Sequence, residues 1–218
     1  MLQGVPDSVL LKALLVHSAR WAELGSEYIK LFRTEQNANR LAEELSRLLG
    51  FGKLSIASVA ECSPTRVTAL GAGVLGEGLG AEHRFPLPPS LAGKRGRRSL
   101  AVTLAWFSPV SPTTHRWRQA HLWFETPKSK LKVKRVGPDW QAAQRGTVQH
   151  DCFEGESASA FVDRDDVVVR VSCREDAAGL GVQVPYALAV TLDVAPELGI
   201  DIYAEIQERV RQRLRVRA

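Results

Sequence analysis

One serine stands in a context that could support nucleophilic chemistry. Ser157 lies among small residues in GESASA, residues 155–160. The hydrolase pattern GxSxG does not occur around it. A nucleophilic serine also needs a base held beside it by the fold, and nothing in the sequence places a histidine there. We therefore interpret residues 155–160 as a strand-to-strand turn, and we predict no catalytic residue in this chain.

The histidines do not form a metal-binding pattern. There are five of them, and none belongs to an HxH or HExxH motif, so we predict no metal site; they are His17, His83, His115, His121 and His150. His17 lies inside a predicted helix, which favours a packed, hydrogen-bonded role. His150 and Asp151 are neighbours in a predicted strand and should point to opposite faces.

The glycine-rich and cysteine-containing segments give no evidence for a cofactor. GAGVLGEGLG, residues 71–80, lacks the Lys-Ser/Thr ending of a phosphate-binding loop, so we interpret it as a hairpin loop. Cys62, Cys152 and Cys173 form no CxxC pair and are odd in number. This pattern favours reduced structural thiols over a zinc site or disulfide framework.

Basic residues occur in three clusters, which raises the question of nucleic-acid binding. The clusters are KRGRR at 94–98, KSKLKVKR at 128–135 and ERVRQRLRVR at 208–217. They are interpreted as a solvated loop, an exposed edge strand and a helix C-terminus, where cations are favourable. Lys and Arg number 29 against 24 Asp and Glu, a net charge of +5. This excess is modest and spread out, so we do not expect a nucleic-acid partner.

Helical periodicity dominates the first part of the chain. Leu10–Trp21, LLKALLVHSARW, places apolar residues at helical spacing after Pro6. Residues 34–49 form a second predicted helix, with Leu41, Leu45, Leu48 and Leu49 on one side. Gly50-Phe51-Gly52 should end it, because glycine favours the helix C-terminus.

A period of two replaces this pattern after about Cys62, and it predicts strands with one buried side. The inward rows are Leu100, Val102, Leu104 and Trp106; Val167, Val169, Val171 and Cys173; and Val184, Tyr186, Leu188, Val190, Leu192 and Val194. QAHLWFETP, residues 119–127, is another such run, and Ile202 to about Leu214 is helical again. The expected fold is α+β and mainly β: N-terminal helices, an antiparallel β-sandwich or jelly roll, and a C-terminal helix.

The segregation of helices and strands suggests two units, with a boundary near residue 60. Residues 1–60 should form a helical unit and residues 61–218 a β-sandwich domain with its C-terminal helix. The first unit is too small and too apolar to bury its own helices well. MLQGVPDS does not have the pattern of a secretory signal, and no apolar run is long enough for a membrane span, so we expect a cytoplasmic protein with no membrane contact.

The order of these segments resembles the C-terminal portion of bacterial subtilisin-like serine peptidases, the subtilases. The resemblance rests on the loop Gly4-Val5-Pro6, the helix Leu10–Trp21, and a closing stretch from Gly50 through Ala57 and Ala60. Beyond it, RVTAL, HRFPLPPSL, LAVTLAWFSPVSP and YALAVTLDV are similar to the β-sandwich appended to the catalytic domain in large members. Leu100–Trp106 is the most recognisable piece.

The resemblance implies that the catalytic segments precede this sequence. A subtilase uses Asp, His and Ser in that chain order, and all three segments would lie before the serine-bearing helix that ends near Met1. No catalytic residue of the family therefore maps onto this chain, which alone should be inactive. The implied partners are the upstream catalytic segment, in the same chain or a separate one, and protein or peptide substrates of the parent enzyme. The alternative is a free-standing β-sandwich interaction module.

Overall fold

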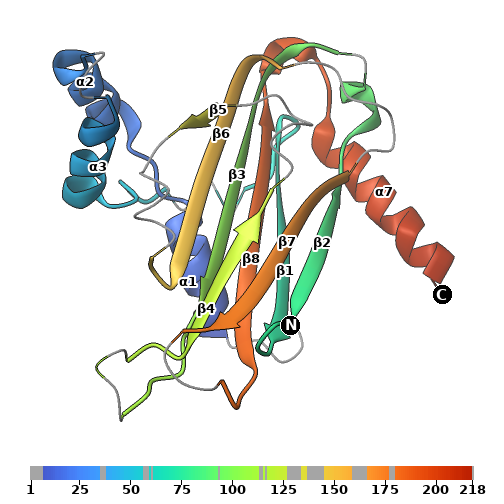
Figure 1. Ribbon diagram of the computed structural model, residues 1–218. Helices are drawn as coiled ribbons and strands as arrows, with labels where there is room; N and C mark the ends of the chain where they lie inside the picture. Colours follow the sequence, from blue (N-terminus) through green and yellow to red (C-terminus); the bar gives the residue numbers. More distant parts are fainter. Residues whose placement is uncertain are drawn as a thin grey trace.

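Two antiparallel β-sheets packed face to face form the body of the protein, as the computed structural model in Figure 1 shows. The structure describes residues 7–34, 38–55, 59, 61–92, 94–112, 115, 117–126, 134–136, 145–158, 166–176 and 180–217. The larger sheet has the strand order β1-β8-β3-β6-β5 and the smaller one the order β2-β7-β4. The strands are β1 (Arg66–Leu75), β2 (Gly80–Pro86), β3 (Gly96–Trp106), β4 (Ala120–Glu125), β5 (Lys134–Val136), β6 (Val148–Ala158), β7 (Asp166–Glu175) and β8 (Val184–Val194).

The chain crosses from one sheet to the other at nearly every connection between strands. Only β5 and β6, which are consecutive and paired, stay in the same sheet. This alternation is the jelly-roll arrangement, in which neighbours in the sheet come from distant parts of the sequence. The expected fold class, α+β and mainly β with an antiparallel sandwich, is thereby confirmed.

Alternating apolar residues from both sheets fill the sandwich interior. Val102 and Leu104 of β3, Val169 and Val171 of β7, and Leu188 of β8 are fully buried in one continuous core. The three inward rows predicted from the period of two are all confirmed. Since successive side chains on a strand point to opposite faces, a single alternating pattern sets both the buried side and the register.

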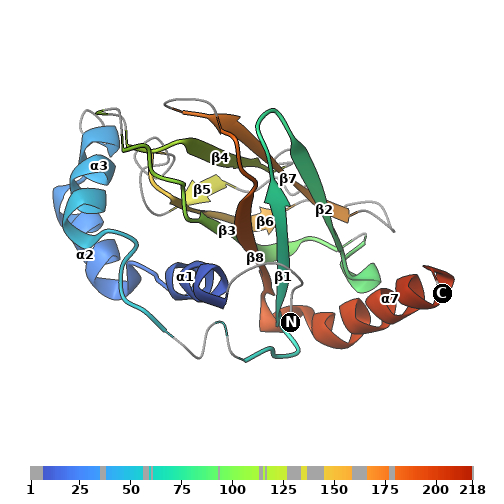
Figure 2. The ribbon, with the colours of Figure 1, turned by 90° about the horizontal axis from the view of Figure 1, so that it is seen from below.

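The helices lie outside the sandwich. They are α1 (Asp7–His17), α2 (Ala22–Phe32), α3 (Ala38–Leu49) and α7 (Ile202–Arg217), with short 3-10 turns at Pro89–Leu91 and Pro196–Leu198. Figure 2 shows α1 lying along the larger sheet, α2 and α3 side by side away from the sheets, and α7 beside β1 and β2. None of the helices in the described part of the chain is both long and apolar enough to cross a bilayer.

The first helix is shorter than its sequence pattern predicts. It ends at His17 rather than at Trp21, and a separate helix, α2, starts at Ala22. Trp21 occupies the junction, where its indole Nε1 donates to the carbonyl of Gly50 at 3.0 Å. The predicted end of the second helix is confirmed, because Gly50 follows Leu49 with a positive φ of 56°.

Three loop predictions are wrong. The turn at residues 76–79 does not close a paired hairpin, because β1 and β2 belong to different sheets. Ser157 lies within β6 and not on a turn, since the strand continues to Ala158. The segment 94–98 is not wholly a solvated loop, because β3 starts at Gly96 and Arg98 is buried, with Nη2 donating to the carbonyl of Lys94 at 3.0 Å.

Candidate functional site

The outer face of the larger sheet, where α1 lies, contains a connected group of polar and titratable side chains. Helix α1 contacts β3, β8 and β6. Val9 and Ala13 of the helix pack on Ala105 and Ala187 of the sheet, and all four are fully buried. Because these side chains are small, the helix can approach the sheet closely enough for polar side chains to bond across the interface.

Six side chains form a continuous hydrogen-bonded chain under this helix, which we call the polar chain: Thr68, Thr191, His17, Thr103, His150 and Cys152. His17 is at its centre, with Nε2 at 2.6 Å from Oγ1 of Thr191 and Nδ1 at 2.7 Å from Oγ1 of Thr103. Thr103 continues to Nδ1 of His150 at 2.6 Å, and Nε2 of His150 lies 3.1 Å from Sγ of Cys152. At the other end Thr191 and Thr68 are 2.7 Å apart.

The contact with Arg20 determines which atoms of the polar chain donate hydrogen bonds and which accept them. Nη1 of Arg20 lies 3.4 Å from Nε2 of His150, and because a guanidinium can only donate, Nε2 accepts. Nδ1 of His150 then donates to Thr103, which donates to Nδ1 of His17. Nε2 of His17 donates in turn to Thr191, and Thr191 to Thr68. Every polar atom along this path is satisfied with both histidines neutral.

The electrostatics of the polar chain keep both histidines neutral. Burial, and next the positive charge of Arg20, lower the pKa of His17 from 6.5 to about 3. Burial also lowers the pKa of His150 well below 6.5, with Arg20 and His17 contributing. A proton added to Nδ1 of His17 would face the donating hydroxyl of Thr103, and one added to Nε2 of His150 would face the Arg20 guanidinium. The prediction that His17 is a packed, hydrogen-bonded histidine is therefore confirmed.

The Cys152–His150 pair does not have the properties of a nucleophile and its base. Burial raises the pKa of the Cys152 thiol from 9.0 to about 11. A reactive thiolate requires a lowered pKa in an accessible, electropositive setting, whereas the pKa of this half-buried thiol is raised. Cys62, Cys152 and Cys173 are all free thiols, of which Cys62 is exposed and Cys173 is buried. The polar chain thus attaches α1 to the sheet and has no catalytic geometry.

Lys12, in the middle of α1, adds a second attachment. Nζ of Lys12 donates to the carbonyls of Trp106 at 2.9 Å and Thr147 at 3.1 Å, and to Oγ1 of Thr147 at 2.7 Å. Lys12 also lies over the ring of Phe107, 4.7 Å from its centroid. The orientation of α1 on the sheet is therefore fixed by polar contacts at its middle and at its C-terminal end.

The side of α1 that faces away from the sheet is apolar and uncovered. Leu11 is 58% exposed and Leu15 is 40% exposed, whereas Leu10 and Leu14 of the same helix are half-buried. Seven of the sixteen exposed large apolar residues in the described chain occur in residues 7–55. We call these seven the helical apolar surface; they are Leu11, Leu15, Tyr28, Leu31, Phe32, Leu48 and Leu54.

Close backbone contact connects the three helices. Arg20 and Lys53 exchange backbone hydrogen bonds of 3.0 and 2.8 Å, which brings the end of α3 beside the end of α1. Gly52 next to this bridge has a φ of 101°, and a Cβ there would lie 2.2 Å from the carbonyl oxygen of Arg20. Leu41 and Leu45 of α3 are buried, whereas Leu48, on the same predicted side, is exposed. Helices α2 and α3 therefore cover each other's apolar side chains only in part.

The remaining histidines lie at separate places. Nε2 of His83 is 2.8 Å from the hydroxyl of Tyr186, at the side of the sandwich near β1. His121 stacks on Trp123 with ring centroids 6.1 Å apart, and its pKa is lowered by burial and then by Arg118 and Arg174. His150 pairs in register with Thr103 and Asp151 with Val102, which confirms that these neighbours point to opposite faces. In the described part of the chain, no group of three or more His, Cys, Asp or Glu could hold a metal ion.

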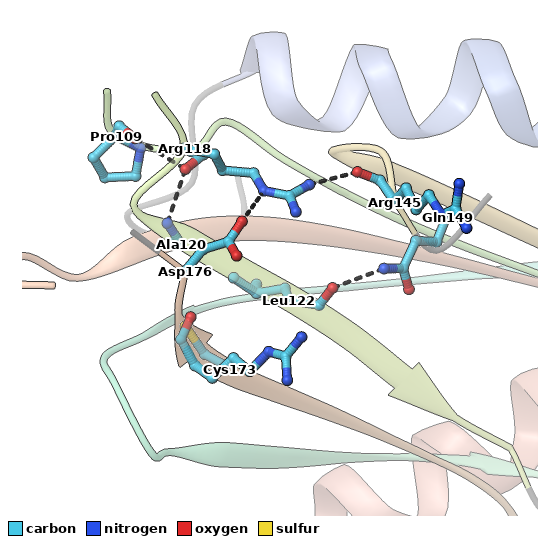
Figure 3. Close-up of polar contacts among 10 residues, drawn as sticks. Pro109, Arg118, Ala120, Leu122, Arg145, Gln149, Cys173 and Asp176 are labelled. Atoms are coloured by element: carbon cyan, nitrogen blue, oxygen red, sulfur yellow. Dashed lines mark hydrogen bonds and ion pairs between the residues drawn. The ribbon is translucent and has the colours of Figure 1, made fainter. Parts of the chain in front are cut away.

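Arg118 organises the polar contacts at one end of the small sheet (Figure 3). Its Nε donates to Oδ2 of Asp176 at 2.5 Å, and Nη1 donates to the carbonyl of Arg145 at 2.5 Å. Nε2 of Gln149 donates to the carbonyl of Leu122 at 2.8 Å, joining β6 to β4. These contacts attach the segment before β4 to the rest of the fold. The role that they give Arg118 is structural.

The basic clusters do not form one described surface. Arg98 of the first cluster is buried, and residues 128–133 of the second lie outside the described residues. Lys134 and Arg135 belong to β5, which pairs only with β6 and is an edge strand as predicted. The third cluster forms the end of α7. Of the segments that carry the subtilase resemblance, Gly4–Pro6, Ala57 and Ala60 also lie outside the described residues.

Comparisons with known proteins do not define a family. No family model matches this chain, and no curated protein matches it. Among solved structures, a chain from the cyanophage Pam1 capsid asymmetric unit is similar at 15% identity, with a TM-score of 0.30, covering 60% of this chain and 83% of that one. A TM-score this low supports no inference about fold or function.

Proposed function

We propose that this chain is the C-terminal, non-catalytic part of a subtilisin-like serine endopeptidase. In this proposal the helical apolar surface contacts the catalytic segment, and the β-sandwich braces that segment or binds substrates or partners. The proposal rests on the order of segments that resembles the family and on the uncovered side of α1.

The single observation that carries the proposal is that α1 turns two of its four leucines, Leu11 and Leu15, away from its own sheet. Val9 and Ala13 face the sheet, while Leu11 and Leu15 face solvent. Burying a leucine side chain contributes about 1.5–3 kcal/mol, so a helix free to rotate would turn these leucines inward. The polar chain and Lys12 hold the helix against that preference. An apolar surface held outward in this way is typical of an interface.

The side chains that could suggest an independent enzyme have structural roles. His17 and His150 are neutral, buried and bonded to threonines, and the Cys152 thiol is kept protonated. This arrangement supports a scaffold more than it supports a hydrolase. The alternative, a free-standing sandwich interaction module, shares the same fold and differs in what covers the helical apolar surface.

The first test reads the coding DNA directly upstream of the Met1 codon. The proposal expects an open frame that encodes Asp, His and Gly-Thr-Ser-x-Ala-x-Pro segments, in one chain with residues 1–218 or as a separate chain. An upstream region without the serine segment in any frame would contradict it and favour the free-standing module.

The second test measures activity of the completed protein. An active-site serine probe should label the upstream segment together with residues 1–218, and should not label residues 1–218 alone. The double variant Leu11→Asp/Leu15→Asp should reduce labelling at least ten-fold by weakening the contact. Leu79→Asp, at a leucine of similar exposure (55%) in the turn after β1, is the matched control and should not. Labelling of the isolated chain that is lost in Ser157→Ala would overturn the proposal.

A further inference from the structure

We infer that a cavity at the edge of the sandwich binds a medium-chain aliphatic carboxylate, with the alkyl tail between the sheets and the carboxylate at Arg84. The cavity lies where β1 and β2, the edge strands of the two sheets, face one another beside α7. The inference is independent of the proposed function, since the helical apolar surface belongs to residues 7–55.

The cavity exists because the inward-facing residues in the middle of β1 have small side chains or none. The inward row of β1 reads Val67, Ala69, Gly71, Gly73 and Leu75, as the register with β8 shows. At Gly71 and Gly73 the missing side chains are replaced, because a Cβ would lie 2.7 Å from Nδ1 of His83 and 2.7 Å from the hydroxyl of Tyr186, respectively. At Ala69 no such replacement occurs, and the space remains open as the cavity.

Helix α7 closes this edge and leaves space beneath it. Three apolar residues form a row at i, i+4 and i+8: Ile202, Ile206 and Val210. Their exposed fractions increase along the helix, from 0% to 9% to 42%. The helix is held by Nη1 of Arg209, which donates to the carbonyl of Leu87 at 2.9 Å, and by Glu205, which accepts from the backbone N–H of Ser90 at 3.0 Å. Ile206 and Val210 line the cavity.

The size and lining of the cavity match an alkyl tail. Its volume is about 320 Å³, at the lower end of the range for small-molecule sites. At about 30 Å³ for each water-sized group, it holds roughly ten such groups. Apart from Arg84, the lining side chains carry no charge; they include Val67, Leu100, Val167, Val190, Leu192 and Phe85.

Arg84 supplies the charge that selects an anion. It lines the cavity, yet its side chain is 60% exposed, so the guanidinium reaches solvent at the rim. Its partner Glu82 accepts from Arg84 at 3.0 Å and from Arg170 at 2.7 Å. Glu125, which lies opposite Arg170 in the register with β4, compensates part of the Arg170 charge, so Glu82 is the carboxylate that Arg84 shares. A guanidinium is well suited to bind a second carboxylate.

The test is calorimetry on the full chain with hexanoate, octanoate, decanoate and decanol, each at a concentration at which the ligand forms no micelles. Each buried methylene should tighten binding about four-fold, so octanoate should bind roughly ten- to twenty-fold tighter than hexanoate. Arg84→Gln should weaken decanoate binding about five-fold and leave decanol unchanged. Arg170→Gln is the matched control, because Arg170 shares Glu82 but does not line the cavity, and it should bind decanoate as the wild type does.

Filling the cavity gives the second arm of the test. Ala69→Leu should abolish binding of both decanoate and decanol and raise the melting temperature, since the new side chain occupies the open space. Methyl NMR of the wild type, with a nitroxide-labelled decanoate, should broaden Val190 and Ile206 and leave Leu11 and Leu15 sharp. Absence of chain-length dependence, equal effects of Arg84→Gln and Arg170→Gln, or broadening away from Val190 would each overturn the inference.

Discussion

The β-sandwich and the helices of residues 7–55 both carry rows of large apolar side chains, and they differ in how these rows are covered. In the sandwich each strand's apolar side meets the opposite sheet, so that Leu104, Leu122 and Leu188 have no exposed surface. In the helical region Leu11, Leu31 and Leu48 are more than half exposed. The core of the sandwich is therefore covered by its own two sheets, whereas the helices expose large apolar side chains.

The largest expected effect comes from comparing the same leucine-to-alanine substitution in the sandwich core and in α1. Leu104→Ala removes a fully buried side chain and should lower the free energy of unfolding by about 2–5 kcal/mol. Leu11→Ala removes a mostly exposed one and should change it by less than about 0.5 kcal/mol. Urea denaturation of the isolated chain measures both, and comparable losses would show that α1 buries Leu11.

The polar chain predicts a loss of stability in acid. The unfolded chain takes up protons on His17 and His150 near pH 6.5, while the folded chain holds both pKa values below that. Stability is therefore fully present above pH 6.5 and falls as the pH is lowered, for His17 by about 1.4 kcal/mol per pH unit down to about pH 3 and for His150 in the same direction.

Denaturation as a function of pH tests this prediction, with His17→Gln as the comparison. The variant should lose some stability at pH 7 and show a shallower dependence on pH between 6 and 4. An unchanged pH dependence in the variant would show that His17 is not held neutral by the fold.

Gly52 tests how α1 and α3 are connected. Gly52→Ala places a methyl group against the carbonyl of Arg20 at a positive φ, and it should destabilise this contact by about 1–3 kcal/mol. Gly50→Ala is the matched control, since Gly50 also has a positive φ but its Cβ would meet nothing within 4 Å. Hydrogen exchange should be faster in α3 of the first variant, and equal effects of the two variants would rule out the contact as the cause.

The smallest expected effect concerns the cysteines. Cys62 is exposed, whereas burial raises the pKa of both Cys152 and Cys173 to about 11. A thiol reagent at pH 8 should modify Cys62 quickly and the other two only on unfolding. Mass spectrometry of the labelled peptides reads this out, and labelling of Cys152 as fast as that of Cys62 would show that the fold does not protect its thiol.

The strands with one alternating apolar row could be predicted from periodicity, and parts of β5 and β6 were also expected to be strands, whereas the second half of β1 was interpreted as a hairpin loop. β3, β7 and β8 have large apolar residues at every second position, so their inward faces were evident. β1 was missed as a strand because its inward row contains Ala69, Gly71 and Gly73, which have no apolar side chain to count. Their space is taken by His83, Tyr186 and the cavity, and a local sequence pattern does not contain such distant contacts.

The buried side of α1 could not be predicted from the sequence for a related reason. Periodicity selects the leucines as the core-facing residues, yet the sheet under the helix presents Ala105, Ala187, Thr103 and Thr191, which fit small and polar partners. Which side of an amphipathic helix is buried depends on the surface that receives it, and that surface is formed by strands about ninety or more residues away. The polar chain was likewise not predicted beyond the packed role of His17.

The central claim, that the helical apolar surface is an interface for an upstream catalytic segment, is tested most directly by hydrogen exchange of residues 7–55. The isolated chain is compared with the chain joined to, or mixed with, the upstream segment. The account predicts slower exchange in α1, α2 and α3 and unchanged exchange in β3, β7 and β8. Equal exchange of the three helices in both samples would contradict it.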